Sequence, residues 1–370
     1  MDGQPTPGRR LLFGAVLVAL VLASVEGASR VYMTRSLGTP LGAPGRAIQR
    51  FYPELDDIEG ETIPRQKGEL DVLLLAGSVL HPAWGTVAHA LGDELALRTR
   101  RHVRIHNAAG VAHTSLDSLH KYRRLADKRF DLVVVYHAIN EVRTNNVPDA
   151  DFRADYSHMD WYRRVNWVAD HDRILRVSAL PYALHDGRML LEQALGRYRP
   201  IPQRRPDPET LRYGAHVKSA ASLRRNLEAI LDLARERGDP VLLATFAWHL
   251  PPDYSPERFR ARALDYDSHG SAVELWGDPP NVVAGLEAHN AVIRELAAER
   301  PDVLFLDAQA RMPREGRYWN DVCHLSARGG LAFAELIADL LESRGVLGRA
   351  PAGGGARGAA SGRASRGSTP

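Results

Sequence analysis

The chain of 370 residues contains a single cysteine, Cys323. No disulfide can therefore form within the chain, and the multi-cysteine patterns of structural zinc sites are missing from the sequence. Metal sites built from histidine and carboxylate alone remain open, but the 15 histidines are scattered without a ligand-like cluster. We therefore expect neither a metal ion nor another cofactor.

The sequence also has little excess charge outside its C-terminal end. Its formal net charge is +3, but four arginines belong to the low-complexity run "RAPAGGGARGAASGRASRGSTP": Arg349, Arg357, Arg363 and Arg366. Without this run the chain is nearly neutral. A nucleic-acid partner is therefore not expected, because such binding relies on clustered basic side chains.

Only one long apolar run is present, "LLFGAVLVALVLASV" from Leu11 to Val25, and it follows Arg9 and Arg10. This order of charge and apolar residues is typical of an export signal. The run is short beside the ~20 residues that span a bilayer comfortably. An uncleaved anchor and a cleaved signal peptide both remain open, and we favour the anchor. The basic flank places the body outside the cytoplasm, tethered to a bacterial cytoplasmic membrane, or secreted if the segment is cleaved.

The rest of the composition, 44% hydrophobic and 25% charged, is that of a globular protein. Residues 31–69 contain Gly and Pro and are mostly polar, which predicts a spacer. We expect the following organisation: a signal anchor or signal peptide at 1–30, this spacer, a folded domain at 70–346 with an insertion at 142–215, and a disordered tail at 347–370.

Five short apolar runs alternate with helical segments in the folded domain. They are "DVLLLAG" (71–77), "HVRIHNAA" (102–109), "DLVVVYHA" (131–138), "PVLLATFA" (240–247) and "DVLFLDA" (302–308). Continuous apolar runs of this length are typical of strands buried on both faces of a parallel sheet. The alternation predicts a three-layer α/β/α sandwich with a five-stranded parallel sheet.

Residues suited to acyl transfer follow these strands. Ser78 comes after the first run, Asn140 after the third, and Asp321 and His324 after the fifth. Because the carboxyl ends of parallel strands meet at one edge of a sheet, these side chains are expected to lie close together. Serine, histidine and aspartate are the nucleophile, base and orienting carboxylate of a hydrolase triad, and an amide is a suitable oxyanion donor.

The four blocks resemble those of the SGNH (GDSL-like) hydrolase superfamily over about residues 70–344, the insertion excepted. The family's Gly-Asp-Ser is matched by "AGS" ending at Ser78, its Gly-x-Asn-Asp by "AINE" containing Asn140, and its Asp-x-x-His by "DVCH" from Asp321 to His324. In the second block, "NAAGVAHTS", Ala112 stands at the place of the family's glycine. The resemblance implies a flavodoxin-like fold.

The resemblance also implies roles. Ser78 would be the nucleophile, His324 the base and Asp321 the residue that orients it, while the N–H groups of Ser78 and Ala112 and the Asn140 amide would bind the oxyanion. His137 and Glu141 flank Asn140 and are predicted to contact the substrate, although hydrogen bonding at the strand end explains them as well.

The sequence thus predicts a serine esterase that acts on O-acyl groups, acetyl among them, of a glycan or a lipid. Two alternatives remain: an O-acyltransferase that uses the same triad, and a degenerate domain that binds a glycan or a partner without catalysis. The expected partners are the acyl-ester substrate and, through the N-terminal segment, the membrane.

Overall fold

The computed structural model describes residues 7–63, 69–201 and 207–346. Its centre is one sheet of five parallel strands in the order β2-β1-β3-β4-β5. The strands are β1 (Glu69–Ala76), β2 (His102–Asn107), β3 (Leu132–Tyr136), β4 (Val241–Ala244) and β5 (Leu304–Leu306). Each lies within a run predicted from the sequence or overlaps it, and the order is that of flavodoxin-like folds.

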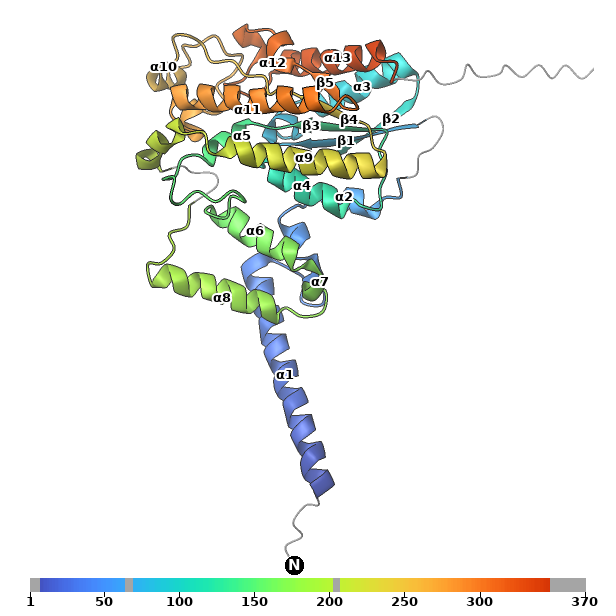
Figure 1. Ribbon diagram of the computed structural model, residues 1–370, viewed down its shortest axis with the longest axis vertical. Helices are drawn as coiled ribbons and strands as arrows, with labels where there is room; N and C mark the ends of the chain where they lie inside the picture. The colour runs from blue at the N-terminus through green and yellow to red at the C-terminus, as the bar shows by residue number, and fades with distance from the viewer. Residues whose placement is uncertain (1–6, 64–68, 202–206, 347–370) are drawn as a thin grey trace, which may run out of the picture.

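The sheet is covered on both faces, as its continuously apolar strands require. Along β1, Leu74 and Ala76 belong to a core formed with helices α3 (Val87–Thr99) and α13 (Ala327–Ser343). The alternate residues, Leu73 and Leu75, pack with α4 (Ser115–Arg124) and α9 (Ser219–Arg237). The three-layer α/β/α sandwich is therefore confirmed (Figure 1).

The remaining helices and 3-10 turns lie around this sandwich. They are α1 (Pro7–Leu37), η1 (Pro44–Arg46), η2 (Ile48–Arg50), α2 (Leu55–Gly60), η3 (Ser78–Leu80), α5 (Ile139–Arg143), α6 (Asp160–Asp170), α7 (Asp172–Leu175), α8 (Leu180–Ala194), η4 (Pro208–Ala215), α10 (Pro256–Arg260), η5 (Val273–Leu275), α11 (Pro279–Glu299), α12 (Ala308–Arg311) and η6 (Gly316–Tyr318).

The prediction of a spacer at 31–69 is wrong for the part that the structure describes. Helix α1 continues to Leu37, and the side chains of Phe51, Tyr52 and Leu55 are buried. These apolar residues pack in the same core as α4 and α9. Residues 31–63, which we call the N-terminal layer, are ordered because their few apolar side chains pack against elements far away in the sequence.

The predicted insertion supplies many of those partners. Its helix α6 buries Tyr162, Val165 and Val168 in the core that also holds Phe51 and Tyr52. Helices α6, α7 and α8 lie between the sheet and the exposed part of α1 (Figure 1). The first predicted residues of the insertion, Val142 and Arg143, instead complete helix α5. The predicted tail, 347–370, falls outside the described residues.

Candidate active site

Ser78 lies at the carboxyl end of β1, where Gly77 turns the chain into η3. A Cβ atom on Gly77 would lie 2.7 Å from Nδ2 of Asn140 and 3.1 Å from the carbonyl oxygen of His113. These distances are closer than a side chain tolerates, so glycine is what lets Asn140 approach the backbone just before Ser78. The SGNH pattern has aspartate at this place. In this chain an aspartate side chain would fit only if Asn140 moved away.

Asp321 and His324 lie on the loop between η6 and α13. A β-bridge between Trp319 and Leu325 closes this loop, and the N–H of Asn320 donates to the carbonyl of His324 at 2.7 Å. Ser326 then caps α13, its hydroxyl accepting the N–H of Gly329 at 3.1 Å. The stretch "WNDVCHLS" is therefore a small hairpin followed by a helix cap.

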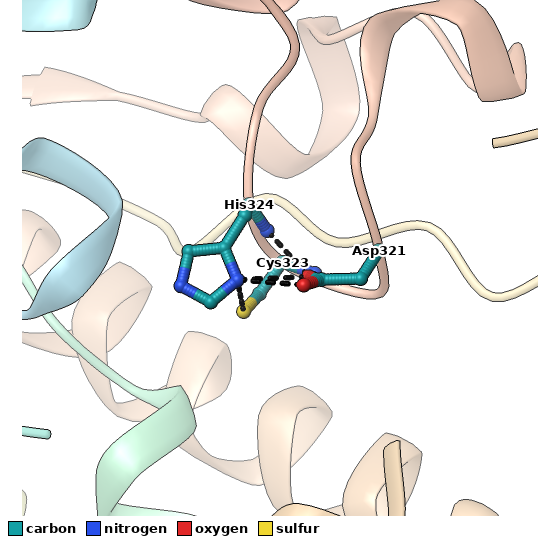
Figure 2. A group of neighbouring side chains, drawn as sticks. All are labelled: Asp321, Cys323 and His324. Carbon is teal, nitrogen blue, oxygen red and sulfur yellow. Dashed lines mark hydrogen bonds and ion pairs between the residues drawn. The ribbon is translucent and has the colours of Figure 1, made fainter. Parts of the chain in front are cut away.

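The three predicted triad residues form one hydrogen-bonded relay. Oγ of Ser78 lies 2.9 Å from Nε2 of His324, and Nδ1 of His324 lies 2.8 Å from Oδ2 of Asp321. Figure 2 shows the imidazole and the carboxylate facing each other across the loop. Because the carboxylate only accepts, Nδ1 carries the proton and Nε2 is left to accept from the serine hydroxyl.

Asp321 is completely buried and held by several N–H groups. Its carboxylate accepts from the backbone of Cys323 at 3.0 Å, of His324 at 2.8 Å and of Ser271 at 2.8 Å. Burial by itself raises the pKa of Asp321, but the neighbouring charge of His324 and these donors lower that pKa overall. The carboxylate therefore stays ionised and can stabilise an imidazolium.

Cys323 lies between the two, with Sγ 3.6 Å from Nδ1 of His324 (Figure 2). Possible ligand atoms of Asp321, Cys323 and His324 lie within 4.8 Å of one another. Burial raises the pKa of the Cys323 thiol, which disfavours the thiolate that metals bind. The carboxylate is also engaged by N–H donors. The arrangement therefore fits orientation of His324 better than metal coordination.

The amide of Asn140 is fixed from both ends. Oδ1 accepts from Nη2 of Arg143 at 2.7 Å and from Nε1 of Trp276 at 3.2 Å. Nδ2 donates to the carbonyl of His113 at 2.9 Å, beside Gly77. Since Oδ1 must face the two donors, the NH₂ group faces the end of β1.

Ala112 lies on the loop between β2 and α4 with φ of +67°. This left-handed region is costly for residues with a Cβ atom and free for glycine. The conformation explains why the matching place in the SGNH pattern is a glycine. The alanine keeps the backbone geometry and stores strain at this place.

A buried ionic network holds the same loop from the other side. Nζ of Lys121 lies 2.7 Å from Nδ1 of His113 and 2.7 Å from the carbonyl oxygen of Ala108, and it also pairs with Glu54. Lys121 is fully buried, and burial lowers its pKa although Glu54 and Asp117 oppose this. The network connects the N-terminal layer to the residue that follows Ala112.

Asp117 extends this network to the insertion. Its carboxylate accepts from Tyr52 at 3.0 Å, from Trp161 at 2.9 Å and from Tyr162 at 2.7 Å. It also accepts the N–H of Thr114 at 2.8 Å, completing the capping box of α4. The N-terminal layer and the insertion thus meet at the start of α4, next to the loop that carries Ala112.

The two residues predicted to contact substrate point elsewhere. Nε2 of His137 lies 2.7 Å from Oγ of Ser118, and burial lowers the pKa of His137 to about 3. Glu141 is fully buried and accepts the N–H of Ser115, and burial raises its pKa to about 7. Both side chains are directed to α4 rather than to the Ser78–His324 pair, so the expectation of substrate contact finds no support in this geometry.

Several site residues were missed by sequence reasoning. The indole of Trp84 stacks on His324 with ring centroids 4.4 Å apart, and Trp276 and Ser271 contact Asn140 and Asp321 as described. None belongs to a recognisable block. Only the proximity of Trp84 to Ser78 in the sequence offered a signal.

The reactive pair is enclosed, since Ser78 is 5% and His324 is 2% exposed. A cavity of about 530 Å³ is lined by Pro208, Leu211, Ser271, Ala272, Glu274 and Leu275. Its wall includes Ser271, whose N–H donates to Asp321. The cavity therefore borders one of the residues whose N–H groups hold the Asp321 carboxylate.

No family model and no curated protein matches the chain. Solved structures do match. A GDSL-like lipase from Bacteroides thetaiotaomicron is 14% identical, with 79% of this chain and 98% of that chain covered and a TM-score of 0.42. An acetylxylan esterase from Geobacillus stearothermophilus is 13% identical, with 75% and 96% covered and a TM-score of 0.41. A lipase/acylhydrolase from Enterococcus faecalis is 14% identical, with 74% and 96% covered and a TM-score of 0.36. By its own strand order the chain is a flavodoxin-like α/β protein, and the structures to which it is similar carry the names lipase, acylhydrolase and acetylxylan esterase.

Proposed function

We propose that this protein is a serine esterase of the SGNH type that hydrolyses O-acyl esters. The observation that carries the proposal is the continuous relay from Ser78 through His324 to Asp321, at 2.9 and 2.8 Å. Ser78 is 246 residues away from His324 in the sequence, and the two meet at the carboxyl edge of the sheet. A serine whose proton can pass to an oriented imidazole is an activated nucleophile.

The acylation step follows from this geometry. Nε2 of His324 takes the proton of Ser78 as Oγ attacks the ester carbonyl carbon, and the resulting imidazolium is stabilised by Asp321. When the tetrahedral intermediate collapses, the proton on Nε2 passes to the leaving alkoxide. The products are the free alcohol and an ester between Ser78 and the acyl group.

The negative charge on the tetrahedral intermediate needs donors at the strand end. The second N–H of the Asn140 amide, with the backbone N–H groups of Ser78 and Ala112, is proposed to supply them. The amide is held in advance by Arg143 and Trp276, so little reorganisation is needed when the charge develops.

Deacylation repeats these steps with water. His324 takes a proton from a water molecule that attacks the acyl carbon, and it returns the proton to Oγ of Ser78 as the carboxylic acid leaves. An O-acyltransferase would use an acceptor hydroxyl in place of this water.

The enclosure of the site favours a small acyl group, such as acetyl. Trp84 stacks on the imidazole and Ser78 is only 5% exposed, which leaves little room for a long chain in this conformation. We further propose that the esterase acts outside the cytoplasm on a glycan or lipid ester, tethered by α1. The helix carries an 18-residue window of mean hydropathy 2.3 with none of the window buried, which fits an anchor.

The proposal is tested by hydrolysis of p-nitrophenyl esters of increasing chain length. The full-length protein is expected to cleave the acetate faster than the octanoate, and Ser78→Ala to abolish cleavage. Ser343→Ala makes the same chemical change at an exposed position on α13 and is expected to behave as the wild type. A folded wild-type protein that cleaves no ester would reject the esterase, and faster transfer to an added oligosaccharide than to water would identify a transferase instead.

A further inference from the structure

Helix α8 presents an apolar face to solvent. Leu184, Leu191 and Leu195, which caps its C-terminus, recur at spacings of seven and four residues and are 65%, 58% and 55% exposed. These spacings place them on one face of a helix. Tyr182 and Met189 lie on the opposite face and are buried. The helix therefore has apolar side chains on two faces, one packed against the body and one exposed to solvent.

The segment before α8 also exposes apolar side chains. Val177 is 75% exposed and Ile174 on α7 is 48% exposed. Together with Leu184, Leu191 and Leu195 they form what we call the α8 face. Large apolar side chains that gather on one part of a protein surface usually mark an interaction site.

The α8 face lies where the candidate membrane helix meets the body. Glu26 of α1 accepts from the hydroxyl of Ser178 at 2.6 Å and from the N–H of Ala179 at 3.0 Å. One turn and a half further along α1, the hydroxyl of Tyr32 donates to Asp186 of α8 at 2.5 Å. Figure 1 shows α8 crossing the upper part of α1, with the exposed part of α1 extending below it. The contacts begin immediately after the apolar run of α1 ends at Val25.

The length of that run brings α8 close to the bilayer. Leu11 to Val25 is 15 residues, which spans about 22 Å at 1.5 Å per residue. The hydrocarbon core of a bilayer is about 30 Å thick. If α1 crosses the membrane, the residues next to Val25 must approach the hydrocarbon boundary, and these are the residues to which α8 is bound.

The charges around the α8 face suit phospholipid head groups. Arg176 and Arg188 flank the apolar residues and have side chains that are 65% and 70% exposed, and each also pairs with a carboxylate, Asp172 at 2.7 Å and Glu192 at 3.1 Å respectively. Long basic side chains beside an apolar stripe bury their stems and leave the guanidinium among phosphates, as in helices that lie in a membrane interface.

We propose that the α8 face lies in the interface of the phospholipid bilayer that α1 enters. The body then contacts the membrane at two places, the spanning helix and the α8 face, so the sheet is held in one orientation instead of swinging on a single helix. This inference depends on the proposed anchor but not on the esterase chemistry.

The test uses the full-length chain in phosphatidylethanolamine–phosphatidylglycerol nanodiscs. A cysteine is introduced as Leu191→Cys and labelled with an environment-sensitive fluorophore. The native Cys323 is completely buried, and treating the unmodified chain with the fluorophore measures any labelling of that residue. Leu97→Cys on α3 is the matched control, because Leu97 is equally apolar and 75% exposed. Val18→Cys reports insertion of α1.

The expected result is a shift to shorter emission wavelength at position 191, with quenching by doxyl-labelled lipid, and neither effect at position 97. Replacing Leu184 and Leu195 by serine should weaken the shift at position 191 while the label at position 18 stays quenched. The proposal is overturned if the label at position 18 is quenched by doxyl-labelled lipid but the label at position 191 shows no more emission shift or quenching than the label at position 97. If position 18 is not quenched either, the anchor also fails, whereas esterase activity on a soluble ester, measured in parallel, reports separately on the proposed function.

Discussion

At the scale of single residues, the amide of Asn140 is held by three hydrogen bonds. Its oxygen accepts from Arg143 and Trp276, and its nitrogen donates to the carbonyl of His113 next to Gly77. An isolated asparagine after a strand is common in turns. Here its partners on both sides leave only one N–H to act on a ligand.

Replacing Asn140 by alanine is expected to reduce kcat about 10²- to 10³-fold, the usual effect of losing one oxyanion donor. The KM for a short-chain ester should change far less, because the donor acts mainly in the transition state. Steady-state kinetics of the purified variant, with circular dichroism as the check on folding, measures both. Near-wild-type kcat in a folded Asn140→Ala protein would exclude this residue from the oxyanion site.

Ala112 offers a second prediction at this scale. Its φ of +67° costs a residue with a Cβ atom about 1 kcal/mol or more. Ala112→Gly should therefore keep the activity and raise the free energy of unfolding by up to about 1 kcal/mol, less the entropy that glycine gains in the unfolded chain. Ala112→Val should lower both the activity and the free energy of unfolding. Urea unfolding of the wild type and the two variants ranks their free energies of unfolding. If Ala112→Gly were less stable than Ala112→Val, the backbone of Ala112 would not be strained.

At the scale of elements, the start of α4 joins three parts of the chain. Glu54 precedes α2, Lys121 and Asp117 belong to α4, and Trp161 belongs to α6. Their side chains make one buried network that ends on His113, whose carbonyl holds Asn140. The N-terminal layer and the insertion therefore support the loop that carries Ala112 and His113.

Lys121→Met removes the central charge of this network. Glu54 loses its ammonium partner and keeps only the imidazole of His113 nearby, at 3.4 Å. Breaking a buried ion pair from one side costs roughly 3 to 5 kcal/mol. We expect a corresponding fall in the free energy of unfolding, and a fall in kcat because His113 is no longer held. The double variant Glu54→Gln/Lys121→Met should recover part of the stability, since no unpaired charge remains. Denaturant unfolding measures the stability of the single and the double variant. If the double variant were no more stable than Lys121→Met, the Glu54–Lys121 ion pair would not account for the loss.

The sequence predicts some of these elements well and others poorly, for physical reasons. The five strands are continuous apolar runs, and the Asp321–His324 block keeps its spacing because both side chains lie on one closed hairpin. Residues 31–63 look like a spacer because their apolar residues are few, and only the distant insertion reveals that they are buried. The directions of His137 and Glu141 depend on partners in α4 and cannot be read from their position beside Asn140.

At the scale of the whole molecule, buried Glu141 makes stability depend on pH. Its pKa is raised by burial from 4.5 to about 7 in the folded protein. Between these values the unfolded chain has lost a proton that the folded chain retains, so the free energy of unfolding falls as pH rises through this window. At 1.36 kcal/mol per pKa unit the contribution lost is about 3 kcal/mol.

Glu141→Gln removes this titration. The stability of the variant relative to the wild type should therefore increase from pH 4.5 to pH 7 and stay level above it. Urea unfolding of both proteins at several pH values measures the difference, in which the other titrating groups cancel. A difference that does not change across the window would show that Glu141 titrates normally in the fold.

The central claim is that the fold makes one serine nucleophilic. The most direct measurement is to treat the folded full-length protein with a fluorophosphonate and to locate the adduct by peptide mass spectrometry. The account predicts one phosphonylated residue, Ser78, in the wild type and no adduct in His324→Ala, because the serine hydroxyl then lacks its base. An unlabelled wild-type protein, an adduct on another residue, or equal labelling of His324→Ala would contradict it.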